Sequence, residues 1–260
     1  MNGRAARASR KIARVQPPID AVVFDYGGVF SSPLFRGVGR FEADMGYPPG
    51  SILELLFGET AYIGVEGRSI VEDGAPPTLD GVPESAHAVT HDWHRLEIGE
   101  LSLDEYFKGV MERAPEVLGK PIDFDAYRRF SAEMPIGVHW QVVHRARELK
   151  ADGLKVALLT NNVKEWGDHW RSTIPLDELF DTVVDSSEVK MRKPDPRVYV
   201  LTCERMGTSP ERAVFVDDNT ENVAAARRLG MEVVLFGDDP WAAMAELDAI
   251  LQRRGTLASA

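Results

Sequence analysis

The sequence has little cysteine, no long apolar segment and no excess of positive charge. Its single cysteine, Cys203, excludes an internal disulfide bond, so we expect a reducing, cytoplasmic environment. No apolar run approaches the roughly 18 residues that a membrane-spanning helix needs, and the N-terminus does not have the apolar stretch of a secretory signal. We therefore expect no association with a membrane.

Acidic residues outnumber basic residues by 41 to 30, which gives a net charge of -11. Because such a molecule repels polyanions, we do not expect nucleic acid as a partner, and a small solute is favoured. Hydrophobic residues make up 44% of the 260 residues, enough for a substantial core in one domain or in one domain with an insertion. The oligomeric state stays open at this stage.

Short apolar runs that end in polar residues recur along the chain and predict buried strands. They cover residues 21–24, 156–159, 183–184, 213–216 and 232–236. Helical patterns lie between them, over 139–152, 196–206 and 222–229, and each is followed by a glycine suited to a left-handed helix end. Strands that alternate with helices predict an α/β fold, a Rossmann-like, doubly wound parallel sheet with helices on both faces.

Two regions depart from this alternation. Residues 1–14 carry five basic and no acidic residues and predict a flexible basic tail. Residues 33–135 carry 19 acidic and 9 basic residues and predict a helical cap inserted into the core, with helices over 51–57, 83–96 and 103–114. The Rossmann-like core then consists of residues 15–32 and 136–255, and we expect hinges at 31–33 and 134–137 that allow the cap to close over the sheet.

Polar clusters follow four of the apolar runs or the loops beside them. They are Asp25, Thr160-Asn161, Lys193 and Asp217-Asp218. Because ligands bind beyond the carboxyl ends of parallel strands, we expect these side chains to converge. Paired carboxylates repel one another unless a cation lies beside them, and Mg²⁺ prefers a few carboxylates with water and phosphate oxygens. The pattern therefore predicts a magnesium and phosphate site.

Four ordered segments also resemble a known family. They are 24–29 (FDYGGV), 159–162 (LTNN), 191–199 (MRKPDPRVY) and 216–222 (VDDNTEN). Their order and spacing, over about residues 19–237, resemble the four motifs of the haloacid dehalogenase superfamily. The resemblance is greatest to phosphatases similar to the N-terminal domain of soluble epoxide hydrolase, including bacterial sugar-phosphate phosphatases and the domain fused to some acyl-CoA dehydrogenases.

The resemblance implies a magnesium-dependent hydrolase of small phosphorylated metabolites, such as sugar phosphates. Asp25 would be the nucleophile that forms an aspartyl-phosphate, and water would then hydrolyse this intermediate. The Asp25 carboxylate, the Gly27 carbonyl and Asp218 would hold Mg²⁺, with Asp217 beside or behind them.

The remaining motif residues would bind the phosphoryl group. Thr160 and Asn161 would hold its oxygens, and Lys193 would neutralise charge on the nucleophile and the phosphate. Lys190 lies three residues earlier, and only the match to the Lys-Pro-Asp-Pro pattern favours Lys193. Asn222 would orient Asp217 or Lys193 from behind.

Gly27 departs from the pattern of most phosphatases in the superfamily, which have a second aspartate at this position as a general acid. Its loss removes a contribution of about 10²–10⁴-fold. The enzyme would then use substrates whose leaving groups depart easily, or a proton donor from the insert. Three other interpretations stay open: phosphonate cleavage through Lys108 or Lys120, carbon–halogen cleavage, and a catalytically weakened binding or regulatory protein.

Two further groups in the insert are candidates for binding, each with a simpler explanation. His87, His91 and His94 have the spacing of one helix face, where metal ligands would be possible but an ordinary polar face is favoured. Arginines could also contact an anionic substrate, although surface charge explains them equally; they are Arg36, Arg40 and Arg68.

Overall fold

The structure is a computed structural model that describes residues 17–33, 35, 37–58, 91–133 and 137–257. The predicted basic tail over 1–14 lies outside these residues. None of the helices in the described ranges combines the length and the apolar character that a membrane span requires.

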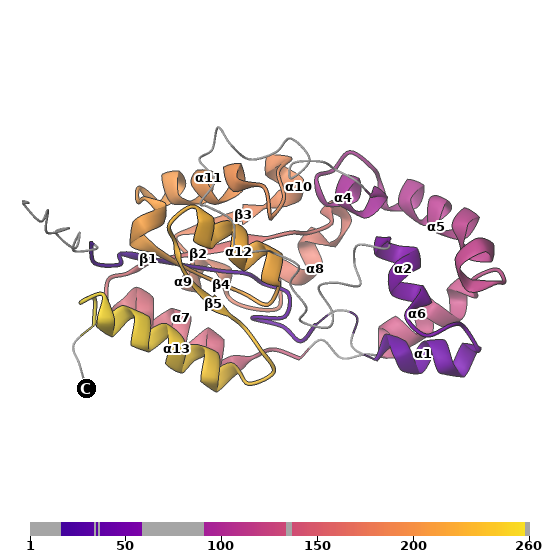
Figure 1. The fold of residues 1–260 in the computed structure, drawn as a ribbon, viewed down its shortest axis with the longest axis horizontal. Helices are drawn as coiled ribbons and strands as arrows, with labels where there is room; N and C mark the ends of the chain where they lie inside the picture. Colours follow the sequence, from indigo (N-terminus) through magenta and orange to yellow (C-terminus); the bar gives the residue numbers. More distant parts are fainter. Residues whose placement is uncertain (1–16, 34, 36, 59–90, 134–136, 258–260) are drawn as a thin grey trace, which may run out of the picture.

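A five-stranded parallel sheet forms the centre of the protein (Figure 1). Its strands are β1 (Ala21–Phe24), β2 (Lys155–Thr160), β3 (Thr182–Asp185), β4 (Ala213–Asp217) and β5 (Glu232–Leu235). Their order is β3-β2-β1-β4-β5, so the chain builds outward from β1 to β3 and then crosses back to β4. The direction of winding changes between β1 and β4, the place where ligands bind in such sheets. The predicted fold class is confirmed.

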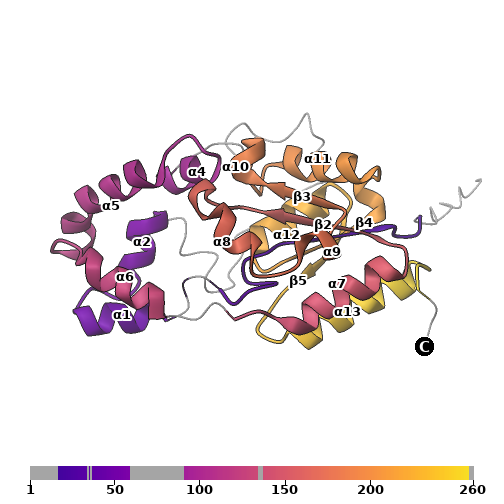
Figure 2. The same ribbon diagram turned by 180° about the vertical axis from the view of Figure 1, so that it is seen from behind.

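Side chains of the strands alternate between two hydrophobic cores. On one face, Val22 and Phe24 of β1 pack with α7 (Trp140–Ala151) and α13 (Pro240–Arg253). On the other face, Ala21 and Val23 pack with α11 (Pro196–Met206) and α12 (Thr220–Arg228) (Figures 1 and 2). Shorter helices complete the core region: η4 (Lys164–Trp166), α8 (Gly167–Arg171), α9 (Leu176–Leu179), α10 (Ser186–Val189) and η5 (Pro210–Arg212).

The predicted helices of the core region are confirmed to within two residues at each end. The glycines that follow them have the left-handed backbone that an L side chain rarely adopts, with φ of 88° at Gly153, 62° at Gly207 and 91° at Gly230. Apolar periodicity and a terminal glycine were therefore sufficient to define these three helices.

Between β1 and α7 the described chain forms helices and, outside one isolated β-bridge, no strand. They are α1 (Val38–Met45), α2 (Ser51–Phe57), α4 (Asp92–Glu97), α5 (Leu103–Leu118) and α6 (Phe124–Glu133). Phe41, Ile52, Tyr106 and Val110 belong to a separate hydrophobic core shared by these helices. Both views show this group, hereafter the helical insert, to one side of the sheet (Figures 1 and 2).

Two predicted helix boundaries in the insert are wrong. The helix predicted over 103–114 continues to Leu118 through Pro115, because Ala114 and Leu118 extend its buried face. In the helix predicted over 83–96, residues 83–90 lie outside the described residues and α4 begins only at Asp92. His91 precedes it in an extended conformation, and its Nδ1 accepts a hydrogen bond of 3.1 Å from the Trp93 N–H. His91 and His94 therefore do not belong to one helix.

The chain leaves and re-enters the sheet region through two paired segments. Ser31 and Val138 form an antiparallel bridge. The Ser32 N–H donates to the Gly137 carbonyl at 2.8 Å, and the Gly137 N–H donates to Ser32 Oγ at 3.0 Å. The two ends of the insert are thus held side by side next to the carboxyl end of β1.

Candidate active site

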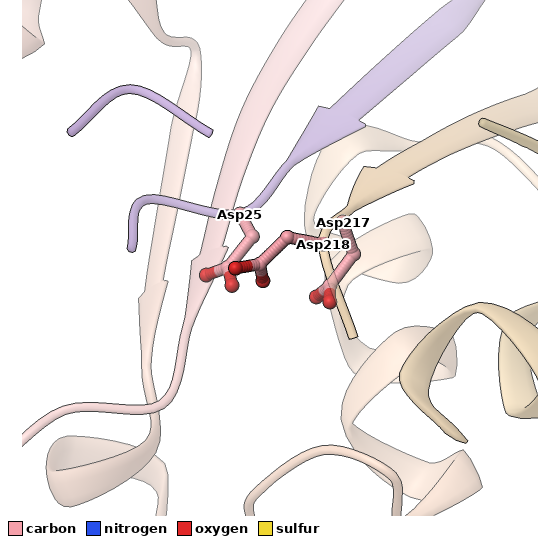
Figure 3. A group of neighbouring side chains, drawn as sticks. All are labelled: Asp25, Asp217 and Asp218. Carbon is pink, nitrogen blue, oxygen red and sulfur yellow. The ribbon is translucent and has the colours of Figure 1, made fainter. Parts of the chain in front are cut away.

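Three aspartates meet at the point where the sheet changes its direction of winding. Asp25 follows β1, Asp217 is the last residue of the neighbouring β4, and Asp218 comes next. One carboxylate oxygen from each lies within 4.8 Å of the others. Figure 3 shows the Asp25 and Asp218 carboxylates close together with Asp217 beside them. The parallel strands therefore bring together residues that are nearly 200 positions apart in the sequence, as the sequence predicted.

Lys193 provides the cation of this group. Its side chain is buried, and Nζ lies 2.8 Å from Asp25 Oδ1 and 2.7 Å from Asp217 Oδ2. A buried ammonium is stable only when it is paired, and here two carboxylates share it. Lys190, the other candidate, is exposed and ends α10 in a left-handed conformation with φ of 56°. The structure thus brings Lys193, and not Lys190, to the aspartates.

Asp217 is surrounded by hydrogen-bond donors. Besides Lys193, its carboxylate accepts from the Asn219 N–H at 2.7 Å and from Asn222 Nδ2 at 3.1 Å to each oxygen. The Asn222 carbonyl in turn accepts a hydrogen bond from the Tyr199 hydroxyl. Asp217 is fully buried, so its carboxylate faces these donors and not the solvent. Asn222 contacts Asp217 from behind, which is one of the two positions that the sequence predicted.

Asn161 has a different environment from the one its predicted role requires. Its Oδ1 accepts from the Lys193 N–H at 2.8 Å, and its Nδ2 donates to the Lys193 carbonyl at 3.0 Å. The side-chain amide thus clamps the main chain of Lys193 on both sides. Thr160 lies at the carboxyl end of β2 and is buried next to this clamp. Sequence reasoning missed the clamp, because nothing in the chain links positions 32 residues apart.

The charges of the site do not balance, since three carboxylates surround one ammonium. Burial raises the pKa of Asp25 well above its ordinary value, although Lys193 opposes the shift. Burial and the neighbouring Asp217 raise the pKa of Asp218 to about 7. Burial alone would lower the pKa of Lys193, but Asp217 and Asp25 outweigh burial and raise it. The site therefore holds more negative charge than its own residues stabilise.

The two glycines after Asp25 have different steric surroundings. Gly28 has φ of 76°, and a Cβ atom there would lie 1.8 Å from Asp218 Oδ2. Only glycine lets the chain pass this close to the carboxylate. A Cβ atom on Gly27 would meet nothing within 4 Å. Nothing in the sequence indicated that, of these two glycines, only Gly28 is required by the site.

The other candidate residues do not join this site. Within the described ranges, the three aspartates are the one group of His, Cys, Asp or Glu side chains placed to share an ion. Lys120 Nζ donates to the Met45 carbonyl inside the insert, and Lys108 is exposed on α5. Arg40 is exposed and pairs with Asp44 on α1. His87, Arg36 and Arg68 lie outside the described residues.

Comparison with known proteins gives, over most of the chain, the same family that the four sequence motifs resemble. The family model for haloacid dehalogenase-like hydrolases matches residues 19–230. The chain is 33% identical over 217 residues to a phosphorylated carbohydrates phosphatase of Thermotoga maritima, covering 82% of this chain and 83% of that protein. It is 28% identical over 234 residues to mouse acyl-CoA dehydrogenase family member 10, where the match covers 89% of this chain but 19% of the relative.

A third relative, (S)-2-haloacid dehalogenase 4A of Burkholderia cepacia, is 29% identical over 107 residues, 41% of this chain and 46% of that protein. Among solved structures, a HAD family hydrolase of Deinococcus radiodurans with bound phosphate and sodium has a TM-score of 0.56 at 20% identity, over 94% of this chain and 99% of that one. A HAD family enzyme of Bacteroides thetaiotaomicron, in complex with magnesium and inorganic phosphate, has a TM-score of 0.53 at 18% identity, over 87% and 98%. The chain belongs to the family of haloacid dehalogenase-like hydrolases.

Proposed function

We propose that the protein is a magnesium-dependent phosphatase of small phosphorylated metabolites, sugar phosphates among them, that works through an aspartyl-phosphate on Asp25. The observation that carries this proposal is the position of Lys193, which lies in hydrogen-bonding distance of both Asp25 and Asp217 at the edge where ligands bind. The similarity to the phosphorylated carbohydrates phosphatase of Thermotoga maritima supports phosphorylated carbohydrates as the substrate class.

Asp25 is oriented before any substrate arrives. Its Oδ1 accepts from Lys193 Nζ at 2.8 Å and from the Tyr26 N–H at 2.6 Å, so two donors fix the rotation of the carboxylate. In the proposed reaction a carboxylate oxygen of Asp25 forms a bond to phosphorus, and the bond from phosphorus to the leaving oxygen breaks. Water then attacks phosphorus and breaks its bond to the Asp25 oxygen, which releases phosphate and restores the carboxylate.

The residues present fit a divalent cation. Three carboxylates against one ammonium leave negative charge uncompensated, and oxygen ligands are those that Mg²⁺ prefers. Asp25, Asp218 and the Gly27 carbonyl would hold the ion, with Asp217 behind them, since Lys193 and Asn222 already occupy its oxygens. When bound, Mg²⁺ supplies positive charge that draws in the phosphoryl group.

Thr160 and Lys193 would bind the phosphoryl oxygens, one through its hydroxyl and the other through its charge. Because the Asn161 amide already binds the Lys193 main chain, we assign the contact of Asn161 with phosphate to its main-chain N–H. Its side chain then serves to fix Lys193.

We assign residues 33–135 as a cap on a core of 15–32 and 136–255. A hydrophobic core distinct from the two that flank the sheet, formed mostly by the insert with Val163 of the core region, supports this division, as do the paired segments around Ser31 and Val138. A cap joined to the core through two adjacent segments can move as one body and exclude water from the site when it closes.

Asp25→Asn tests the nucleophile. We expect magnesium-dependent phosphate release from a panel of sugar, acyl and nucleotide monophosphates by the native protein and none by the variant, with an unchanged circular dichroism spectrum. Retention of near-native activity by the variant would refute the assignment.

One observation favours carbon–halogen hydrolysis as a second candidate. Gly27 offers no carboxyl group to protonate a leaving group, and a halide leaves without a proton. A 2-haloacid assayed beside the phosphate panel distinguishes the two reactions, because one releases halide and the other phosphate.

A further inference from the structure

The helical insert contacts the loop that carries Lys193, between α10 and α11. The contact is made by a buried acidic residue, Glu97, the last residue of α4. The geometry points to Glu97 as a positioning residue for Lys193: it holds the loop that carries Lys193 and so makes the position of the lysine depend on the docked insert. This inference rests on the proposed function, in which Lys193 neutralises the nucleophile and the phosphate.

The first contact joins side chains. Glu97 Oε2 lies 2.6 Å from Arg192 Nε, and the side chains of Glu97 and Arg192 are 7% and 21% exposed. Arg192 directly precedes Lys193, whose main-chain N–H and carbonyl are both held by the Asn161 amide. Since burial weakens the competition of water for the two charges, this ion pair fixes Arg192 far better than a surface pair would.

The second contact uses the main chain of the same residue. Ser186 Oγ donates to the Glu97 carbonyl at 2.6 Å and accepts from the Asn162 N–H at 2.9 Å. Asn162 follows Asn161, the residue that clamps Lys193. Glu97 is thus linked to both sides of the contact between Asn161 and Lys193. It binds Arg192, next to Lys193, directly, and it is linked to Asn162, next to Asn161, through Ser186.

Two other contacts join the insert to η4 of the core. The Leu103 N–H donates to Glu165 at 3.0 Å in an exposed position, and the rings of Trp93 and Trp166 lie 5.9 Å apart. These contacts hold the insert against η4, whereas Glu97 forms an ion pair with Arg192, the residue before Lys193. Nζ of Lys193 must lie between two carboxylates, so a displacement of its main chain changes both ion pairs.

Glu97→Gln tests the inference, with Glu100→Gln as the matched control. Glu100 is on the same segment but pairs with Arg95 at 3.7 Å, half-exposed and away from the loop. We expect Glu97→Gln to lower kcat about tenfold with little change in KM, and to speed hydrogen exchange of the main chain over 190–195 in the free protein. We expect Glu100→Gln to change neither quantity.

A double variant separates positioning from general loss of structure. If Glu97 acts through Arg192, then Glu97→Gln with Arg192→Gln lowers kcat no further than Arg192→Gln alone. Should Glu97→Gln fail to fold, Ser186→Ala removes only the second contact, and we expect it to lower kcat and to speed exchange over 190–195 to a smaller extent.

The two proposals fail in different ways. Native exchange rates over 190–195 in Glu97→Gln would overturn the positioning role, as would additive effects in the double variant, even if the protein is an active phosphatase. Absence of phosphatase activity in the native protein would overturn the proposed function. Fast exchange in Glu97→Gln would still show in that case that Glu97 orders the loop.

Discussion

The site has two halves with opposite electrostatic character. In the rear half, Lys193, Asn222 and the Asn219 N–H satisfy the fully buried Asp217. In the front half, Asp25 and Asp218 lie together with raised pKa values. The comparison shows that hydrogen-bond donors are already in place at the rear, whereas the front lacks positive charge to balance its two carboxylates. The proposed binding of an exchangeable cation and an anionic substrate requires such an arrangement.

The largest effect should come from removing the cation of the rear half. Lys193→Met keeps the length of the side chain but leaves Asp217 and Asp25 buried without their counter-charge. We expect it to abolish turnover and to lower the free energy of unfolding by about 3–5 kcal/mol. Urea unfolding and a phosphatase assay measure the two effects. Lys190→Met, at an exposed lysine three residues earlier, is the control. An equal loss of activity and stability in both variants would contradict the assignment of Lys193, rather than Lys190, to the site.

A smaller effect should come from filling the space beside Asp218 in the front half, where Gly28 leaves no room for a side chain. Gly28→Ala places a Cβ atom 1.8 Å from Asp218 Oδ2 at a positive φ, so the Asp218 carboxylate must shift from its position. We expect a loss of about 1–3 kcal/mol in stability and weaker Mg²⁺ binding, measured by unfolding and calorimetry. Gly27→Ala meets open space and should change stability by less than about 0.5 kcal/mol. If the two variants behave alike, the close approach at Gly28 is unimportant.

The smallest effect concerns the pH dependence of the front half. Burial and Asp217 raise the pKa of Asp218 to about 7, so the metal-free native state binds more protons than the unfolded chain from about pH 4 to 7. The contribution of Asp218 to the stability of the metal-free native state therefore falls as the pH rises through that window. Because Mg²⁺ competes with the proton, its stabilising effect should be larger near pH 8 than near pH 5.5.

Thermal unfolding with and without Mg²⁺ at both pH values measures this difference. Asp218→Asn should reduce it, since the amide does not titrate, whereas Asp25, whose pKa is raised as well, still contributes. An equal Mg²⁺ effect at the two pH values in the native protein would contradict the assignment of Asp218 to the front half.

The sheet could be predicted because its information is local. Apolar runs such as 21–24 and 213–216 define strands, and the alternation with helices defines their parallel arrangement. The positions of Asp25 and Asp217 follow, since residues that end adjacent parallel strands must meet. Choosing Lys193 over Lys190 required the family resemblance, because the left-handed conformation of Lys190, which turns the chain after α10, is not evident from the sequence.

The contacts between distant segments could not be predicted. The Asn161 clamp, the Glu97–Arg192 pair and the clearance at Gly28 each depend on how two segments approach in space. The helix over 103–118 shows the limit of local rules in another way, since burial of Leu118 outweighs the helix-breaking tendency of Pro115. Tertiary packing decided both kinds of feature.

The most direct test of the central claim traps the intermediate. The native protein is mixed with Mg²⁺ and an aryl phosphate, quenched in acid and reduced with borohydride, and its peptides are analysed by mass spectrometry. We expect Asp25 to be converted to homoserine in proportion to the trapped phosphate, with no conversion of Asp217 or Asp218. Steady release of phosphate without any modification at Asp25, or with the modification at another residue, would contradict the claim that Asp25 is the nucleophile.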